Sequence, residues 1–132
     1  EWARAVDNLP DVSKLGEPAS VRQGSPWFNS APENIVREVT GQLVVPTSGV
    51  YRLSLTSDDG SRLFLGGELL IDNDGLHAAE TKTADIALAK GAHPIRILWF
   101  NRTGGAALSL AVGLAGGKTQ EVTIDMLRTS GK

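Results

Sequence analysis

The clearest pattern in the chain is a strict alternation of apolar and polar side chains over residues 49–57. Single polar positions separate the apolar ones, with Tyr51, Leu53 and Leu55 alternating with Arg52, Ser54 and Thr56. Successive side chains of a β-strand point to opposite faces, so the alternation predicts a strand with one buried and one solvated face. Residues 46–49 are turn formers, and we expect the apolar run 36–45 to pair with this strand across a hairpin.

A second hairpin is predicted over residues 62–72, where two largely apolar stretches, 62–65 and 68–72, flank Gly66 and Gly67. Glycine adopts the positive φ angles of two-residue β-turns without a steric cost, so this pair is a strong turn signal. Further strands are expected at residues 83–88, 95–101, 106–112 and 120–124, followed by a short helix at 125–128.

Many short strands separated by glycine-rich turns predict an all-β fold, an antiparallel β-barrel or sandwich. The first thirty residues differ, because Pro10, Pro18 and Pro26 interrupt regular elements there. We expect this segment to form an N-terminal arm that wraps across the sheet. With 132 residues, 41% of them apolar, the chain is long enough to build one core, so we treat residues 1–132 as a single domain.

Composition and charge argue against several classes of function. The net charge is −2, with 13 basic and 15 acidic residues intermixed, so no basic stripe is available for nucleic acid. The apolar runs are far shorter than the roughly 20 residues of a membrane-spanning helix. Cysteine is absent, which removes disulfides and thiol nucleophiles. Because the chain begins at Glu1 without an initiator methionine or signal peptide, we expect a piece of a longer protein.

Two adjacent carboxylates, Asp58 and Asp59, directly follow the best-defined strand. On a regular strand they would point to opposite faces and could not act together as acid and base, whereas in a bend they can converge. Oxygen ligands that converge in this way suit calcium. The alternative is an ordinary solvated turn, because Asp and Gly are common turn formers. These residues alone leave both interpretations open.

Other polar motifs give weaker signals. Residues 72–75 lack the ligand spacing and terminal glutamate of a helical calcium loop, which favours a tight polar turn. His77 and His93 are not spaced as zinc ligands. A glycoside hydrolase needs two carboxylates held apart across a cleft, which adjacent aspartates do not provide. We therefore expect a non-catalytic module.

Four stretches, in this order along the chain, resemble the domain family named after the anthrax protective antigen. They are GVYRL at 49–53, SDDGSRLFLGGE at 57–68, LIDNDG at 70–75 and LAKGAHPIRI at 88–97. The resemblance implies a twisted antiparallel β-barrel or sandwich, as found in bacterial glycosidases, adhesins and toxins and in yeast flocculins. It also implies an exported location: secreted, periplasmic or at the cell surface.

The same resemblance implies calcium as a cofactor. In the sugar-binding, flocculin-like members, two consecutive aspartates joined by a cis peptide bond hold calcium together with an asparagine and backbone carbonyls of a second loop. Asp58 and Asp59 match the pair, and Asn101 matches the asparagine. Thr103 and Gly105 stand where the carbonyl ligands are expected.

The sugar is then expected against the calcium and five residues: Asp58, Asp59, Asn101, Arg102 and Gly104. Stronger flocculin lectins carry a longer or aromatic side chain where Gly104 and Gly105 stand, so we expect a weaker grip on a sugar ring. The guanidinium of Arg102 is a candidate to compensate with its several donors.

The predicted function is thus a calcium-dependent carbohydrate-binding module of an exported glycosidase or adhesin. Its expected partners are glycans and other domains of its parent chain, and we expect a monomer in isolation. The alternative is a structural or protein-interaction module of the same fold without sugar binding.

Overall fold

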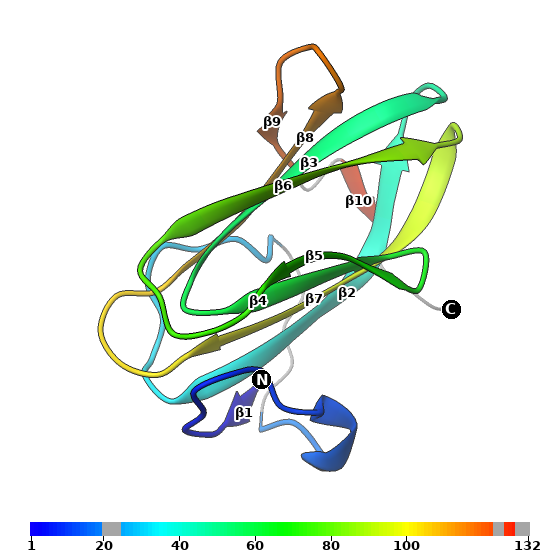
Figure 1. The fold of residues 1–132 in the computed structure, drawn as a ribbon. Coiled ribbons are helices and arrows are strands. Elements are labelled where there is room, and N and C mark those ends of the chain that lie inside the picture. Colours follow the sequence, from blue (N-terminus) through cyan, green and yellow to red (C-terminus); the bar gives the residue numbers. More distant parts are fainter. Residues whose placement is uncertain (20–24, 123–125, 129–132) are drawn as a thin grey trace.

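The computed structural model describes residues 1–19, 25–122 and 126–128, and these form a sandwich of two antiparallel β-sheets (Figure 1). The first sheet has the order β1-β2-β7-β4-β5, with β10 also paired to β2, and the second has the order β6-β3-β8-β9. The described residues contain no α-helix, and the N-terminal segment contains a 3-10 turn, η1 (Val12–Lys14). The all-β prediction is confirmed, as a sandwich rather than a closed barrel.

The strands are β1 (Trp2–Ala3), β2 (Ile35–Val45), β3 (Gly49–Asp58), β4 (Ser61–Leu65), β5 (Glu68–Asn73), β6 (Glu80–Leu88), β7 (Gly91–Asn101), β8 (Ala107–Leu114), β9 (Gln120–Glu121) and β10 (Leu127–Arg128). The expected strands are present, and most differ from the prediction only at their ends. The helix expected at 125–128 is wrong for its last two residues, which pair with Leu43 and Gln42 of β2. A four-residue helix is unstable alone, and pairing with a strand satisfies the same backbone groups. Residues 123–125 lie outside the described part of the chain.

The predicted hairpin between residues 36–45 and 49–57 is also wrong, because β2 and β3 belong to different sheets. β2 pairs with β7 along its whole length, from Ile35 opposite Asn101 to Val45 opposite Gly91. β3 pairs instead with β6 and β8. Residues 46–48 therefore carry the chain from one sheet to the other. Each strand turns an apolar face toward the interior, so its alternation is the same whether or not the two strands pair.

The second predicted hairpin is confirmed. Leu65 pairs with Glu68, and the turn between β4 and β5 consists of Gly66 and Gly67, with φ angles of 62° and 86°. Both angles are positive, as a tight two-residue turn requires.

The inward faces of the two sheets form one apolar core. Tyr51, Leu53 and Leu55 of β3 are buried, as their alternation predicts. Trp99 of β7 is fully buried and meets the ring of Phe28 edge-on, with ring centroids 4.7 Å apart. Such aromatic pairs contribute beyond the area they bury. Phe28 and Trp99 therefore help to hold the segment before β2 against the sandwich.

The N-terminal arm is confirmed as a wrapping segment. A second buried cluster joins Trp2, Leu9 and Val12 of the arm to Val36, Leu98 and Phe100 on the first sheet. The arm lies below that sheet in Figure 1, and its strand β1 pairs with the start of β2. The arm thus gives this side of the first sheet its own small core.

Strand β6 forms one edge of the second sheet and is joined to β3 by a row of side-chain pairs. Arg52 pairs with Asp85 at 2.8 Å, and the hydroxyl oxygens of Thr56 and Thr81 lie 2.6 Å apart. These contacts fix the side chains of the edge strand on its solvent face.

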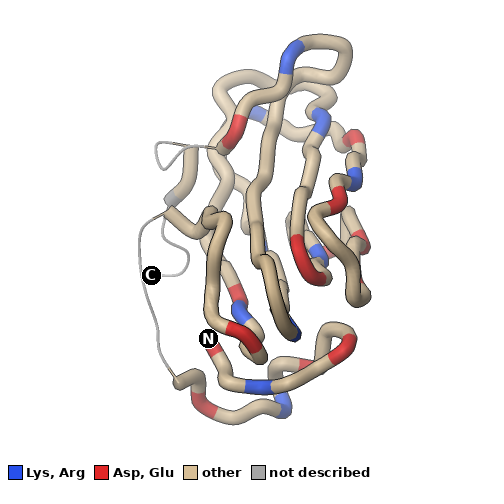
Figure 2. The backbone as a smooth tube through the Cα atoms, turned by 90° about the vertical axis from the view of Figure 1, so that its left-hand side faces the viewer, with Lys and Arg blue, Asp and Glu red and all other residues tan. Residues whose placement is uncertain are grey.

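Charged residues of both signs are interspersed along the backbone (Figure 2). No helix in the described ranges is long and apolar enough to span a bilayer.

Candidate functional site

Three segments that are distant in sequence meet at one end of the sandwich, on the left in Figure 1. They are the turn after β3, the loop after β7 and the residues just before β2. Asp59 donates its backbone N–H to the carbonyl of Phe100 at 3.1 Å, and Asn34 donates its N–H to the carbonyl of Arg102 at 2.9 Å. The loop after β7 therefore lies between the other two segments.

Asp58 and Asp59 are held firmly at the end of β3. The peptide bond between them is cis. The carbonyl of Asp58 accepts a hydrogen bond from Trp99 Nε1 at 3.0 Å, and Asp59 Oδ2 accepts one from the Arg102 N–H at 2.8 Å. Asp59 is buried and Asp58 is half-buried. Main chain and side chain of the pair are thus fixed by β7 and the loop that follows it.

The two carboxyl groups converge instead of pointing to opposite faces. Burial raises the pKa of Asp58, and the charge of Asp59 and a hydrogen bond between the two carboxyl groups raise it further. Two carboxylates this close repel one another unless a proton or a cation lies between them. The pair is therefore chemically suited to hold a cation.

Asn101, the last residue of β7, is fully buried and only partly satisfied. Its Nδ2 donates to the carbonyl of Pro32 at 3.1 Å, whereas its Oδ1 has no hydrogen-bond partner. A buried unpaired oxygen costs about 1–3 kcal/mol. Asn101 stands between Phe100 and Arg102, both of which bond to Asp59. The free oxygen and the two carboxylates form a donor set that fits calcium.

The rest of the loop after β7 is exposed. A Cβ added to Gly105 would lie 3.5 Å from Asp58 Oδ2, so this residue lies near the aspartate pair. Thr103 and Gly104 lie between Gly105 and Arg102 and are exposed. The guanidinium of Arg102 lies 3.9 Å from the carboxylate of Asp7 in the arm. The structure thus brings Asp58, Asp59, Asn101 and Gly105 together, while the Arg102 side chain contacts the arm.

Sequence analysis missed the segment formed by Pro32, Glu33 and Asn34. Its three residues bond to the loop after β7, through the Pro32 carbonyl, the Asn34 N–H and the Glu33 carboxylate, which accepts the N–H of Gly104 at 2.8 Å. The Pro32 and Glu33 contacts join residues 69 and 71 positions apart. Nothing in the sequence around these three residues indicates that they contact a loop about seventy positions away.

The polar turn predicted at residues 72–75 is confirmed only for its second half, because Asp72 and Asn73 are the last residues of β5 and the chain bends at Gly75. Asp72 Oδ1 accepts the N–H of Asp74 at 3.2 Å, and Asp74 Oδ1 accepts the N–H of Leu9 at 2.9 Å. The turn therefore ties the arm to the sandwich. Within the described ranges, no three His, Asp or Glu side chains gather as metal ligands, so any cation here needs amide and backbone oxygens too.

A half-buried histidine lies close to this turn. His77 presents Nδ1 to the Ala78 carbonyl and Nε2 to the Asn73 carbonyl, each at 2.8 Å. Burial opposes charge on the ring, but the two carbonyls, with Glu80 and Asp59, raise the pKa of His77 overall. The imidazolium form satisfies both carbonyls at once.

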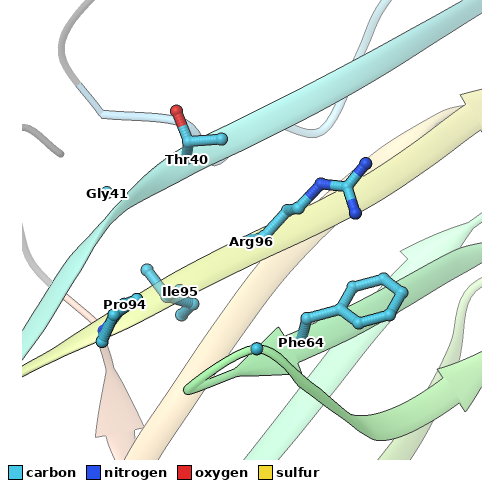
Figure 3. A pocket seen from close by; sticks show the side chains of 7 residues that line it. Thr40, Gly41, Phe64, Pro94, Ile95 and Arg96 are labelled. Carbon is cyan, nitrogen blue, oxygen red and sulfur yellow. The ribbon is translucent and has the colours of Figure 1, made fainter. Parts of the chain in front are cut away.

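A separate groove of about 300 Å³ crosses the first sheet (Figure 3). Its lining includes Thr40, Phe64, Pro94 and Arg96. The Arg96 guanidinium lies 5.3 Å from the Phe64 ring centroid and is paired with Glu38 at 2.6 Å. None of the residues predicted to bind metal or sugar lines this groove, and its one charged lining group is already paired.

The family model of the PA14 domain matches residues 10–125. The chain belongs to the PA14 domain family. No curated protein sequence matches the chain significantly. The family assignment agrees with the resemblance in sequence and with the sandwich described above.

Solved structures with a similar fold include other PA14 domains. A PA14 sugar-binding domain from an RTX adhesin is 23% identical, with a TM-score of 0.64 over 72% of this chain and 54% of that one. The PA14 domain of the MpAFP antifreeze protein is 14% identical, with a TM-score of 0.76 over 99% and 87% of the two chains. A β-glucosidase from Kluyveromyces marxianus in complex with glucose is 24% identical, with a TM-score of 0.50 over 61% and 10%. At these identities the likeness concerns the fold, and this chain spans about half of the adhesin structure.

Proposed function

We propose that this PA14 domain is a calcium-dependent carbohydrate-binding module of an exported protein such as a glycosidase or an adhesin. The observation that carries the proposal is the buried, unpaired Oδ1 of Asn101 beside two converging carboxylates. Two structural relatives, a PA14 sugar-binding domain and a β-glucosidase in complex with glucose, support the choice of ligand class.

The chain supplies the donors in a fixed arrangement. Asp58 and Asp59 would give carboxylate oxygens, Asn101 its amide oxygen, and Thr103 and Gly105 backbone carbonyls. Calcium accepts six to eight oxygens and keeps some positions for water, which neighbouring hydroxyls of a sugar can replace. The Arg102 guanidinium and the backbone at Gly104 border the exposed side of this site.

A non-catalytic role fits the same geometry. Glycoside hydrolysis uses two carboxyl groups held about 5 Å or more apart on either side of the scissile bond. The carboxyl groups of Asp58 and Asp59 instead lie close enough to hydrogen-bond to each other. Asp59 also accepts the N–H of Arg102 in the loop after β7. The parent protein can still be an enzyme, with this domain placing it on a glycan in a secreted, periplasmic or cell-surface location.

A structural or protein-interaction module is the second candidate. It is favoured by Gly104 and Gly105, which offer no side chain to grip a sugar ring.

A thermal melt of the metal-stripped domain, with and without calcium, tests the proposal. Calcium at a hundredfold excess over its Kd adds about 2.7 kcal/mol to the folded state, a rise in Tm of several degrees at this size. Asp58→Ala and Asn101→Ala should abolish the rise. Asp85→Ala, which removes an exposed carboxylate on β6, should keep it.

Sugar binding is then tested by screening glycans on the calcium-loaded domain and repeating each positive result in a chelator. Binding that disappears with the metal supports the lectin function. A calcium-induced rise in Tm without any glycan binding would leave the structural module as the better account. If calcium does not raise the Tm of the parent protein, the proposed calcium site is contradicted.

A further inference from the structure

We propose that Glu33 is a positioning residue of the calcium site, which orients the peptide group between Thr103 and Gly104 so that the Thr103 carbonyl faces the ion. This inference rests on the proposed function. It assigns a role to the segment before β2, which contributes none of the expected ligands.

The loop after β7 is held both by Glu33 and by the aspartate pair. Glu33 Oε2 accepts the N–H of Gly104 at 2.8 Å. The N–H of Arg102 bonds to Asp59 Oδ2 at 2.8 Å, and a Cβ added to Gly105 would lie 3.5 Å from Asp58 Oδ2. Neighbouring residues of the loop are therefore held by Glu33 and by the aspartate pair.

The geometry of the peptide group sets the direction of its carbonyl. In a trans peptide the N–H and the C=O point in opposite directions. Within the described ranges the Asp58–Asp59 bond is the one cis peptide bond, so the Thr103–Gly104 bond is trans. Because its N–H points to Glu33, its Thr103 carbonyl points away from Glu33. In the proposed site the ion lies on that side of the peptide group.

Each of the three consecutive peptide groups between residues 101 and 104 has a different hydrogen-bond partner. The N–H of Arg102 is held by Asp59, the carbonyl of Arg102 by Asn34, and the N–H of Gly104 by Glu33. Of these partners, Glu33 alone fixes the group whose carbonyl is an expected ligand.

Without the Glu33 contact the loop would be flexible. Gly104 has a φ of 79°, and neither Gly104 nor Gly105 has a side chain to pack. Glycine populates several backbone conformations at similar cost, so an unheld peptide group can rotate. A hydrogen bond to a carboxylate is stronger than one between neutral groups, and Glu33 therefore selects one orientation.

The test is titration calorimetry with calcium on the parent and on Glu33→Ala, Glu33→Gln and Glu68→Ala. Glu33→Ala removes the acceptor, and loss of an outer partner of this kind lowers metal affinity about 10- to 100-fold. Glu33→Gln keeps an acceptor oxygen without the charge and should bind within about threefold of the parent at physiological salt. Glu68→Ala removes an exposed carboxylate at the β4–β5 turn and should bind as the parent does.

A second readout separates orientation from general stability. With terbium in place of calcium, luminescence lifetimes in light and heavy water count the waters bound to the ion. Glu33→Ala should gain about one water, replacing the lost carbonyl, and Glu33→Gln should gain none. Because Glu33 is exposed, both variants are expected to fold, and Glu33→Ser is a second variant without the acceptor at the required reach.

Three results would overturn the inference. Parent-like affinity and water count in Glu33→Ala would remove the positioning role while leaving the calcium site in place. If Glu33→Ala and Glu33→Gln weaken calcium binding equally, the loss is due to the missing negative charge and not to the missing hydrogen bond. A parent protein that binds no calcium would overturn the proposed function and this inference together.

Discussion

Among the described residues, two side-chain oxygens, on Asn73 and Asn101, are buried without a hydrogen-bond partner. The amide nitrogen of Asn73 donates to Ser57 and to the carbonyl of Glu80, so it is fixed between the sheets. The amide nitrogen of Asn101 is held by the carbonyl of Pro32. Each amide thus presents its oxygen in one direction. For Asn101 the proposed partner is an ion.

Gly60 is the residue at which a single added carbon should disturb the site most. A Cβ there would lie 2.6 Å from the backbone nitrogen of Gly75 and 2.6 Å from Phe100 Cε1. Backbone cannot yield cheaply, so we expect Gly60→Ala to lower the free energy of unfolding by about 1–3 kcal/mol. Urea unfolding of the metal-free domain measures this loss.

Gly105→Ala is the matched control for Gly60→Ala. Its added carbon would meet Asp58 Oδ2 at 3.5 Å, which is an ordinary contact distance. The control should change stability by less than about 0.5 kcal/mol. Equal losses in the two variants would show that the turn at Gly60 can relax.

His77 should make stability depend on pH in a definite direction. Its pKa is raised in the folded state, although burial opposes charge, because Asn73 and Ala78 accept from the ring and Glu80 and Asp59 lie nearby. A raised pKa stabilises the fold fully below the unfolded value of about 6.5, and this contribution is lost as pH rises through the folded value.

Glutamine at this position has one amide donor group and carries no charge. We therefore expect His77→Gln to destabilise the domain more at pH 5.5 than at pH 8.5, measured by urea unfolding in a chelator. Comparing the variant with the parent at each pH removes the effects of groups that do not interact with His77. A deficit that is equal at both pH values, or larger at pH 8.5, would contradict the prediction.

At the level of elements, the N-terminal arm packs on the first sheet through its own small cluster. Leu9 is 8% exposed and lies in the small cluster on the first sheet, and its N–H bonds to Asp74. Leu9→Ala keeps that hydrogen bond and removes only the packing. We expect a loss of about 2 kcal/mol or more in the free energy of unfolding.

The same change should loosen the arm before the sandwich unfolds. Hydrogen exchange should accelerate over residues 1–15 more than in β3 or β7, because the arm forms a separate cluster. Asn8→Ala, an exposed neighbour, is the control and should change neither quantity. Uniform acceleration across the chain would mean that arm and sandwich open as one unit.

Sequence patterns identified the strands well, because a strand buried on one face alternates apolar and polar residues, as residues 49–57 do. They identified partners only where a turn fixed them, as Gly66 and Gly67 do for β4 and β5. The strand that pairs with β2 along its whole length is β7, which begins only at Gly91, and nothing local to residues 36–45 indicates this. The short strand Leu127–Arg128 likewise depends on the distant β2 and was predicted as a helix.

At the scale of the whole molecule, both sheets close over one core, so a change in that core should destabilise the entire sandwich. Leu53 is fully buried at its centre. Leu53→Ala should cost about 2–5 kcal/mol, with fluorescence and circular dichroism reporting the same transition. Leu114→Ala, at a site 49% exposed, should cost much less. Separate transitions for the two probes would show that the sheets unfold independently.

The candidate site exists only in the complete fold. Its donors come from the end of β3 and from the loop after β7, and the segment before β2 holds that loop from a position about seventy residues away. Residue chemistry alone marked Asp58 and Asp59 as notable but could not choose between a turn and a metal site. The resemblance to a family added Asn101 and the loop, whereas Glu33 required the structure.

The edge strand β6 affects whether separate copies of the domain can pair with one another. In the described part of the second sheet, β3 is its one strand neighbour, so its outer edge offers free backbone groups to another molecule. Three exposed charged residues, Glu80, Lys82 and Asp85, lie along it. Charges on an edge strand disfavour strand-to-strand aggregation. The charges along β6 therefore oppose the pairing of this edge with the same edge of another copy.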